Sequence, residues 1–296
     1  MTRSFVALAA TVTLIAASAR TPLAASQPGA SRPAPRQTPA QQPPQQGTPV
    51  VSTSNAARPE IVLIDDPQTR IPFGVGERSE YDVRFGPIRV GSGSMEVVGT
   101  EQVRGHDALH TVFRVKGGTF FYKVDDRFES WMDSRTLSSL RFVQDQQEGR
   151  KDREKHFEIF PDRAVFAEEG KEEQPSVKQP LDDGSFIYFV RTVPLTVGQT
   201  YEFNRYFRPD RNPVRIRVLR RERVTVPAGT FNAIVVQPSI KAKGIFSENG
   251  QAQIWFSDDA NRVMLQMKSN LSFGSLNLYL TKHRPRPGGA PLAGVK

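Results

Sequence analysis

Alternation of apolar and polar residues is the sequence feature that most restricts the fold of this chain. Between 71 and 283 the two kinds of side chain alternate with a period of two residues, for example at 109–116 and 276–280. A strand with this pattern buries one face and exposes the other. Short segments rich in Gly, Pro, Asn and Asp, such as Gly117-Gly118, read as turns between strands. The pattern predicts a mainly β domain built as an antiparallel curved sheet or barrel-like meander.

One segment of this domain has helical character instead. Residues 183–185 offer an N-cap, and Phe186, Phe189 and Val190 follow at the spacing of a single helix face before Pro194 ends the segment. We expect one short inserted helix that packs on the sheet.

An internal repeat divides the domain into halves at about 75–150 and 197–281. The segment beginning at Val75-Gly76 recurs at Val197-Gly198, and the two tryptophans, Trp131 and Trp255, occupy equivalent positions, each followed by a polar turn. Repeated sheet halves tend to pair their edges with one another. We therefore expect two copies of one strand run, with a hairpin and the helix inserted between them.

The first 70 residues are expected to lie outside the β domain of 71–283. Residues 1–25 have a positive charge, an apolar core and small residues before cleavage sites after Ala19 or Ala25, as a signal peptide does. Residues 26–70 form a Pro/Gln-rich segment that we expect to be a disordered tether. These features predict a periplasmic or secreted protein without a transmembrane segment.

The net charge of +9 is local in origin. Outside the signal peptide and the tether, it is concentrated in a basic tail at 284–296, which we expect to be disordered, and in an arginine-rich strand. The candidate anion-binding residues are Arg205, Arg208, Arg215, Arg217 and Arg220. Arginines on an outward face would be attracted to an anionic envelope surface, whereas nucleic acid is not an expected partner of an exported protein. A solvated strand face with cross-strand ion pairs explains the cluster equally well.

Aromatic residues form the second candidate surface, for an apolar ligand. Its residues are Phe121, Tyr122, Trp131, Phe186, Phe189 and Trp255. Phe121 and Tyr122 face opposite sides of their strand, so rings lie on both sides of it, which is more than one core face requires. A curved sheet of this size either fills with such rings or leaves a cavity between them. Both alternatives are open at this point.

No catalytic or metal-binding constellation is recognisable. His106 and His110 share one strand face but lack a third ligand. The adjacent acids at 125–126 point to opposite faces of a strand, and those at 182–183 fit a helix cap. The absence of cysteine excludes thiolate metal sites and cysteine nucleophiles. We expect a protein that is not an enzyme and that has no cofactor.

Several segments resemble a known family. They are the segment 75–81 with Gly91 and Gly93, the segment 227–233 and the two tryptophan turns, and in them the sequence resembles the bacterial domain-of-unknown-function 3108 family. The resemblance extends over about 74–282. It implies exported proteins of no established activity, and it contributes no catalytic residues. The architecture is also distantly similar to the lipoprotein carriers of the Lol A and B type, whose half-barrels hold acyl chains.

Two functions follow as expectations. The first is an exported, non-enzymatic envelope protein that binds an apolar or amphiphilic, lipid-like ligand between its halves, with the helix at 186–190 as a lid. The second is a protein-interaction or scaffold module that docks on an envelope component through the arginine-rich strand.

Overall fold

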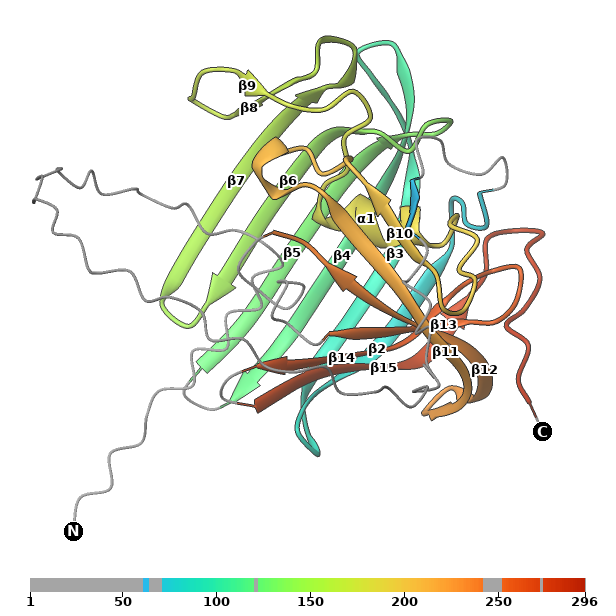
Figure 1. Cartoon of the computed structure of the whole chain (residues 1–296). Coiled ribbons are helices and arrows are strands. Elements are labelled where there is room, and N and C mark those ends of the chain that lie inside the picture. The colour runs from blue at the N-terminus through green and yellow to red at the C-terminus, as the bar shows by residue number, and fades with distance from the viewer. Residues whose placement is uncertain (1–60, 64–70, 120–121, 242–251, 272–273, 296) are drawn as a thin grey trace, which may run out of the picture. The chain divides into compact units, whose positions relative to one another are not determined.

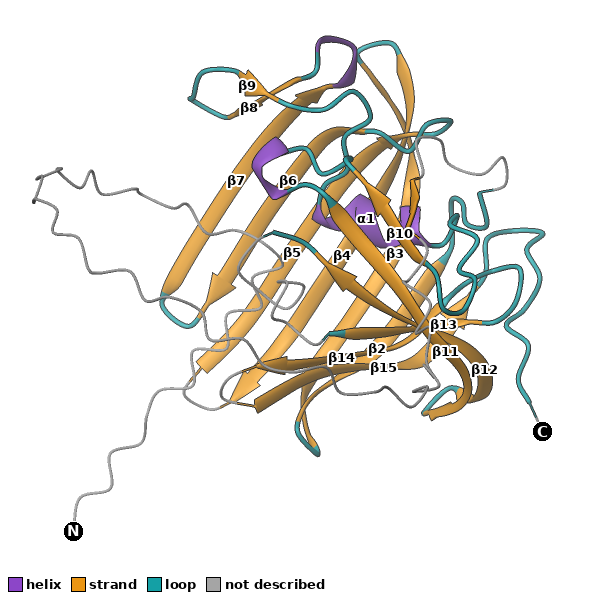
Figure 2. Ribbon diagram, in the orientation of Figure 1, coloured by secondary structure: helices purple, strands orange, loops and turns teal. Residues whose placement is uncertain are grey.

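The computed structural model describes residues 61–63, 71–119, 122–241, 252–271 and 274–295 (Figures 1 and 2). The elements of these residues are β1 (Ile61–Leu63), β2 (Arg78–Phe85), β3 (Ile88–Val103), β4 (His106–Thr119), β5 (Tyr122–Asp133), β6 (Ser139–Glu148), β7 (Lys151–Phe160), a 3₁₀ turn (Pro161–Arg163), β8 (Val165–Glu168), β9 (Gln174–Pro175), α1 (Asp183–Val190), β10 (Thr200–Phe203), a second 3₁₀ turn (Pro209–Arg211), β11 (Val214–Val226), β12 (Gly229–Ser239), β13 (Gln253–Ser257), β14 (Met264–Leu271) and β15 (Gly274–Arg284).

The described strands form a single curved sheet (Figure 1). Its order is β1-β10-β11-β12-β13-β14-β15-β2-β3-β4-β5-β6-β7-β8-β9. The neighbours pair antiparallel, except that β1 runs parallel to β10. The segment before α1 links the two sides of this arrangement, because Leu181 accepts a hydrogen bond from Phe207 N–H and donates one to the carbonyl of Arg205. The prediction of an antiparallel, barrel-like meander is confirmed.

The strands of the two predicted halves follow the same order in the sheet. Strands β2–β7 and β10–β15 each follow one another in the sheet, and β15 pairs with β2 at the seam between the halves. Gly76 and Gly198 both have φ of 88°, in the left-handed region that favours glycine. Gly76 N–H donates to the carbonyl of Val97 on β3, and Gly198 N–H donates to that of Val218 on β11.

The tryptophans make equivalent contacts in the two halves. Trp131 Nε1 on β5 donates to Glu101 Oε2 on β3 at 2.8 Å. Trp255 Nε1 on β13 donates to Glu222 Oε1 on β11 at 2.5 Å. In both halves the bond crosses the intervening strand, β4 or β12, and so ties three strands together on one face of the sheet.

Helix α1 lies inside the curve of the sheet, where it contacts β4 and β5 (Figure 2). The Asp182 side chain caps it by accepting bonds from the backbone N–H groups of Gly184 and Ser185, both at 2.8 Å. Every residue of α1 except Gly184 is buried, and the Phe189 ring lies 4.9 Å from that of Phe203 on β10. The inserted helix is confirmed, but its burial on all sides makes it part of the core. The prediction that it serves as a lid is therefore wrong.

The C-terminal end of α1 is tied to both halves by one buried arginine. Arg191 NH1 and NH2 contact the two carboxylate oxygens of Glu77 at 2.5 and 3.0 Å. Its NH2 also donates to the carbonyl of Asn261, in the turn between β13 and β14, at 2.8 Å. The guanidinium lies over the ring of Phe73. The helix is thereby fixed at its end as well as along its sides.

The predicted turn at Gly117-Gly118 is wrong, because both residues continue strand β4. A Cβ atom on Gly117 would lie 2.3 Å from the carbonyl oxygen of Val90, and one on Gly91 would lie 2.1 Å from that of Lys116. These glycines therefore permit a close approach of the β3 and β4 backbones instead of a reversal of the chain.

The flanking segments differ in part from the expectations. Within the expected tether, residues 61–63 form β1. In the expected tail, Val295 N–H donates to the carbonyl of Thr230 at 2.8 Å, and Leu292 packs against the core. The signal peptide and the rest of the tether lie outside the described residues. Within the described ranges, no helix has the length and apolar character needed to cross a bilayer.

Candidate ligand-binding site

Four polar side chains line up on the inner face of β5 and β6, and we call them the polar row. They are Asp126 on β5 and Gln144, Gln146 and Glu148 on β6, and all four are buried. Asp126 and Gln146 are direct cross-strand partners, and Gln144 and Glu148 lie two residues to either side along β6. This face of the sheet is the one turned to α1, since Ser130 on β5 donates to the cap residue Asp182 at 2.5 Å.

Several atoms of the polar row have no hydrogen-bond partner among the described residues. They are both carboxylate oxygens of Asp126, Nε2 of Gln146 and Oε1 of Gln144. Cross-strand neighbours have Cβ atoms about 5 Å apart, so Asp126 and Gln146 are within reach of each other and still make no bond. Buried polar atoms are nearly always hydrogen-bonded in native proteins. The unmet atoms therefore make the surroundings of Asp126 the candidate site.

The polar row continues into the helix through a chain of buried hydrogen bonds. Gln144 Nε2 donates to Asp183 Oδ2 at 3.1 Å, and the Tyr206 hydroxyl donates to Asp183 Oδ1 at 2.8 Å. Arg211 NH1 in turn contacts the Tyr206 hydroxyl at 3.3 Å. At the other end of the row, Glu148 forms an ion pair with Arg153 on β7 at 2.9 Å. Asp183 and Glu148, the acids at the two ends, thus each have polar partners, and the unmet atoms lie around Asp126.

Burial changes the acidity of this cluster. Loss of solvent, the largest cause, and the negative charge of Glu148 raise the pKa of Asp126 to about 7. The backbone N–H of Gln147, whose geometry toward Asp126 is too poor for a hydrogen bond, and the charge of Arg153 lower the pKa but do not offset the burial. Burial likewise raises the pKa of Asp183 well above its ordinary value. The protonation state of Asp126 therefore changes near neutral pH.

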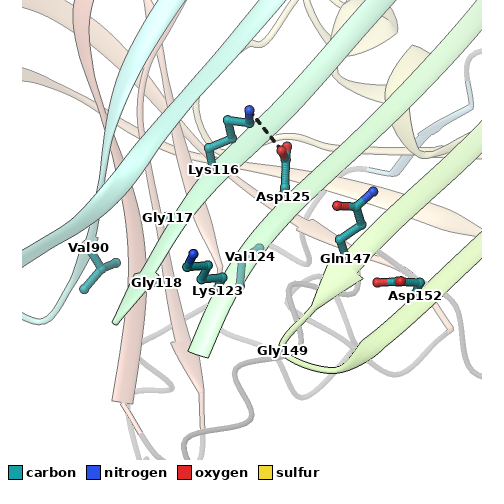
Figure 3. A pocket seen from close by; sticks show the side chains of 10 residues that line it. All are labelled: Val90, Lys116, Gly117, Gly118, Lys123, Val124, Asp125, Gln147, Gly149 and Asp152. Atoms are coloured by element: carbon teal, nitrogen blue, oxygen red, sulfur yellow. Dashed lines mark ion pairs between the residues drawn. The ribbon is translucent and has the colours of Figure 1, made fainter. Parts of the chain in front are cut away.

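A pocket of about 570 Å³ opens where strands β3 to β7 end (Figure 3). Figure 3 shows Lys116 and Asp125 directed toward each other at its rim, where they form an ion pair of 2.9 Å. Val124 lines the pocket too, and its cross-strand partner is Glu148, the outermost residue of the polar row. Lys116, Asp125 and Gln147, however, are cross-strand neighbours on the outer face, so most of the pocket lining lies on the face opposite the polar row.

The structure does not bring the predicted aromatic set together on one surface. Phe186 and Phe189 lie within the core on α1. Trp131 packs in a separate small cluster with Val103, Ala108 and Leu140, and it stacks on His110 at a centroid distance of 4.1 Å. Trp255 is the equivalent residue of the other half. Phe121 lies outside the described residues, as does the side chain of Tyr122, whose backbone begins β5.

The five predicted arginines also fall into different environments. Arg205 is buried and donates to the carbonyls of Gln179 and Thr136 at 2.8 and 2.9 Å. Arg208 covers the rings of three phenylalanines: Phe157, Phe166 and Phe207. On β11, the ion-pair partners of Arg215 and Arg220 are Glu202 and Glu222. Arg217 is exposed. Three of the arginines share the outer side of β11, and the other two do not.

Sequence reasoning missed the polar row. The pair at 125–126 was expected to point to opposite faces, and it does: Asp125 binds Arg114 on the outside, and Asp126 is buried inside. The available signal was a polar residue at an inward position of an alternating strand. His106 and His110 bind acids, and no group of three metal-ligating side chains is found among the described residues.

Comparison with known proteins identifies the family. The family model for proteins of unknown function called DUF3108 matches residues 80–281. The chain belongs to this family. The resemblance noted in the sequence is thus confirmed over nearly the whole β domain. No protein with a curated description matches the chain.

Solved structures with partial similarity to the chain include the following three. A β-barrel-like DUF1849 protein from Brucella abortus is 14% identical, with a TM-score of 0.47, and the match covers 72% of this chain and 99% of that one. A candidate lipoprotein from Parabacteroides distasonis is 12% identical, with a TM-score of 0.34 and coverage of 75% and 100%. An exported protein with a YmcC-like fold from Bacteroides fragilis is 10% identical, with a TM-score of 0.29 and coverage of 72% and 98%.

Proposed function

We propose that this member of the DUF3108 family is an exported, non-enzymatic envelope protein that binds an amphiphilic ligand at the polar row. The ligand enters the inner face at the ends of β3 to β7. Its polar end meets Asp126, Gln144 and Gln146, and its apolar part lies against the neighbouring inner face of β4 and β5, which carries Val115 and Phe128.

One observation carries this proposal: several polar atoms of the polar row are buried and have no hydrogen-bond partner among the described residues. Ligand sites in proteins are concave, largely apolar, and contain a few polar groups that fix the orientation of the ligand. The signal-peptide pattern of residues 1–25 supports the exported location.

The proposal differs from the sequence expectation in the place of the ligand. The helix and its aromatic residues are core, so the ligand binds at the open end of the first half instead of under α1. The scaffold alternative has less support, since Arg205 is buried, and Arg215 and Arg220 are ion-paired.

The test is to purify the protein from the envelope fraction without detergent and to analyse it by native mass spectrometry and organic extraction. We expect a stoichiometric amphiphile in the wild-type protein and its loss in Gln146→Met, which removes the unmet donor at nearly constant volume. The matched control is Gln266→Met, a buried glutamine on β14 in the other half. A ligand-free wild-type protein that also takes up no added amphiphile would contradict the proposal.

A further inference from the structure

The unmet atoms of the polar row include both hydrogen-bond acceptors and a donor, and their numbers indicate which chemical group of a ligand would satisfy them. Three are acceptors, namely the two carboxylate oxygens of Asp126 and Oε1 of Gln144, and one, Nε2 of Gln146, is a donor. An ammonium group presents three donors and no acceptor, whereas a carboxylate presents acceptors alone. The inventory therefore matches a ligand group that is rich in donors.

The charges around Asp126 also favour a positively charged ligand group. Glu148 is the nearest further acid, and its charge is balanced by the ion pair with Arg153 on β7. Asp125, the neighbour on the same strand, is held on the other face by Arg114 and Lys116. No ion pair to Asp126 is found among the described residues. A cation can thus complete the local charge balance, and an anion would meet an uncompensated carboxylate.

We propose that Asp126 selects the head group of the ligand and that this group is a positively charged nitrogen, such as a primary ammonium. The inference rests on the proposed function, because it concerns the ligand of the same site. Asp126 Oδ1 and Oδ2 and Gln144 Oε1 receive the N–H donors, and the Gln146 amide donates to a neighbouring oxygen of the ligand. Hydrogen bonds between charged partners are about twice as strong as neutral ones, so Asp126 dominates the selection.

The test compares three probes of equal chain length on the full chain, each below its micelle concentration and measured by isothermal titration calorimetry at pH 8. The probes are dodecylamine, dodecanol and dodecanoate. We expect dodecylamine to bind about tenfold more tightly than dodecanoate, because one charge-assisted bond separates them. Tighter binding of dodecanoate or dodecanol would overturn the inference and leave the proposed function intact. Binding of none of the three would contradict the proposed function.

The substitution Asp126→Asn tests the contribution of the Asp126 carboxylate charge to binding. We expect it to weaken dodecylamine about tenfold and to leave dodecanol unchanged, since only the charged contact is lost. The matched control is Asp125→Asn, one residue away on the outer face, for which dodecylamine affinity should stay unchanged. Equal losses in the two variants would mean unspecific attraction and would overturn the inference. If Asp126→Asn does not fold by circular dichroism, Gln144→Met, which removes the third acceptor, takes its place with a smaller expected loss.

The pH dependence provides a second readout. The groups that face Asp126 are Glu148 of β6 and Arg153 of β7, with Asp125 on its own strand. Because the pKa of Asp126 is raised to about 7, dodecylamine affinity should rise between pH 6 and pH 8, as the carboxylate forms while the amine stays protonated. Asp126→Asn should remove this rise. A wild-type affinity that does not change with pH would contradict the role of Asp126.

Discussion

Arg191 shows how a buried charge is held in this protein. Its guanidinium has two contacts to Glu77 and two to the carbonyl of Asn261, and it lies over the rings of Phe73 and Tyr188. Removing a charge from water is costly, and only a partner with good geometry offsets that cost. Loss of one partner leaves the other charge buried alone. The pair therefore fixes the position of α1 more than it adds net stability.

We expect Arg191→Met to lower the free energy of unfolding by about 3–5 kcal/mol, because it leaves the Glu77 carboxylate buried without its cation. Urea titration followed by circular dichroism measures the change. Arg221→Met is the control: its ion pair with Asp258 is exposed, and its loss should cost about 1 kcal/mol or less. Equal effects of the two substitutions would contradict the role assigned to Arg191.

Asp126 should make stability depend on pH. Its pKa in the folded protein, about 7, lies above the ordinary value of 3.8, so the folded state holds the proton more tightly than the unfolded state. Stability from this group is present below the ordinary value and is lost as the pH rises toward 7. Relative to Asp126→Asn, the wild type should lose up to about 4 kcal/mol between pH 4 and pH 8. Urea titrations of both proteins at the two pH values measure this difference, and parallel pH profiles would contradict it.

At the scale of elements, the strands of the polar row explain what the sequence could and could not predict. Alternation correctly assigns the inward face of β5 through Phe128, and that of β6 through Phe142. The same alternation places Asp126 and Gln144 inward, but a polar residue in a strand is normally taken to face water. Gln144 is held inside by Asp183 of α1, which also binds Tyr206, and these residues are distant from it in sequence. Local patterns therefore predict the strand and not the site.

Strands β3 and β4 allow a matched pair of glycine substitutions. A Cβ on Gly91 would collide with the backbone of β4, whereas one on Gly99, farther along β3, would meet no atom within 4 Å. We expect Gly91→Ala to lower the free energy of unfolding by about 1–3 kcal/mol or more through overpacking. Gly99→Ala should cost nothing or stabilise slightly, since glycine weakens a strand. Denaturant titration compares them, and a Gly91→Ala variant as stable as Gly99→Ala would mean that the strands do not approach closely.

At the scale of the whole molecule, the repeat was predictable because its markers are local. Gly76 and Gly198 have the same φ angle in equivalent turns, and the two tryptophans lie on equivalent strands. The place of α1 inside the curve and the contacts of Arg191 were not predictable, because they join segments from both halves. Of the predicted aromatic set, Phe186 and Phe189 lie in the core on α1 and Trp131 in a separate cluster, and a local pattern does not predict which elements those rings will pack against.

The symmetry of the halves predicts equal roles for the two tryptophans. Each Nε1 donates to a glutamate two strands away in the sheet, so Trp131→Phe and Trp255→Phe each remove one charge-assisted bond. We expect each to lower the free energy of unfolding by about 1.5–3 kcal/mol. Thermal and urea unfolding measure both variants. A large effect in only one of them would mean that the halves, although alike in fold, are stabilised differently.

The pairing of β15 with β2 has a consequence for biogenesis. Strand β2 is made long before its partner β15, so its hydrogen-bonding edge stays open until β15 has been synthesised. Open strand edges attract other chains, and such distant pairings form slowly. We expect a chain that ends before Gly274 to form aggregates in size-exclusion chromatography, whereas one that ends after Arg284 remains a single species. A nascent chain of this protein thus depends on β15 to close the edge of β2.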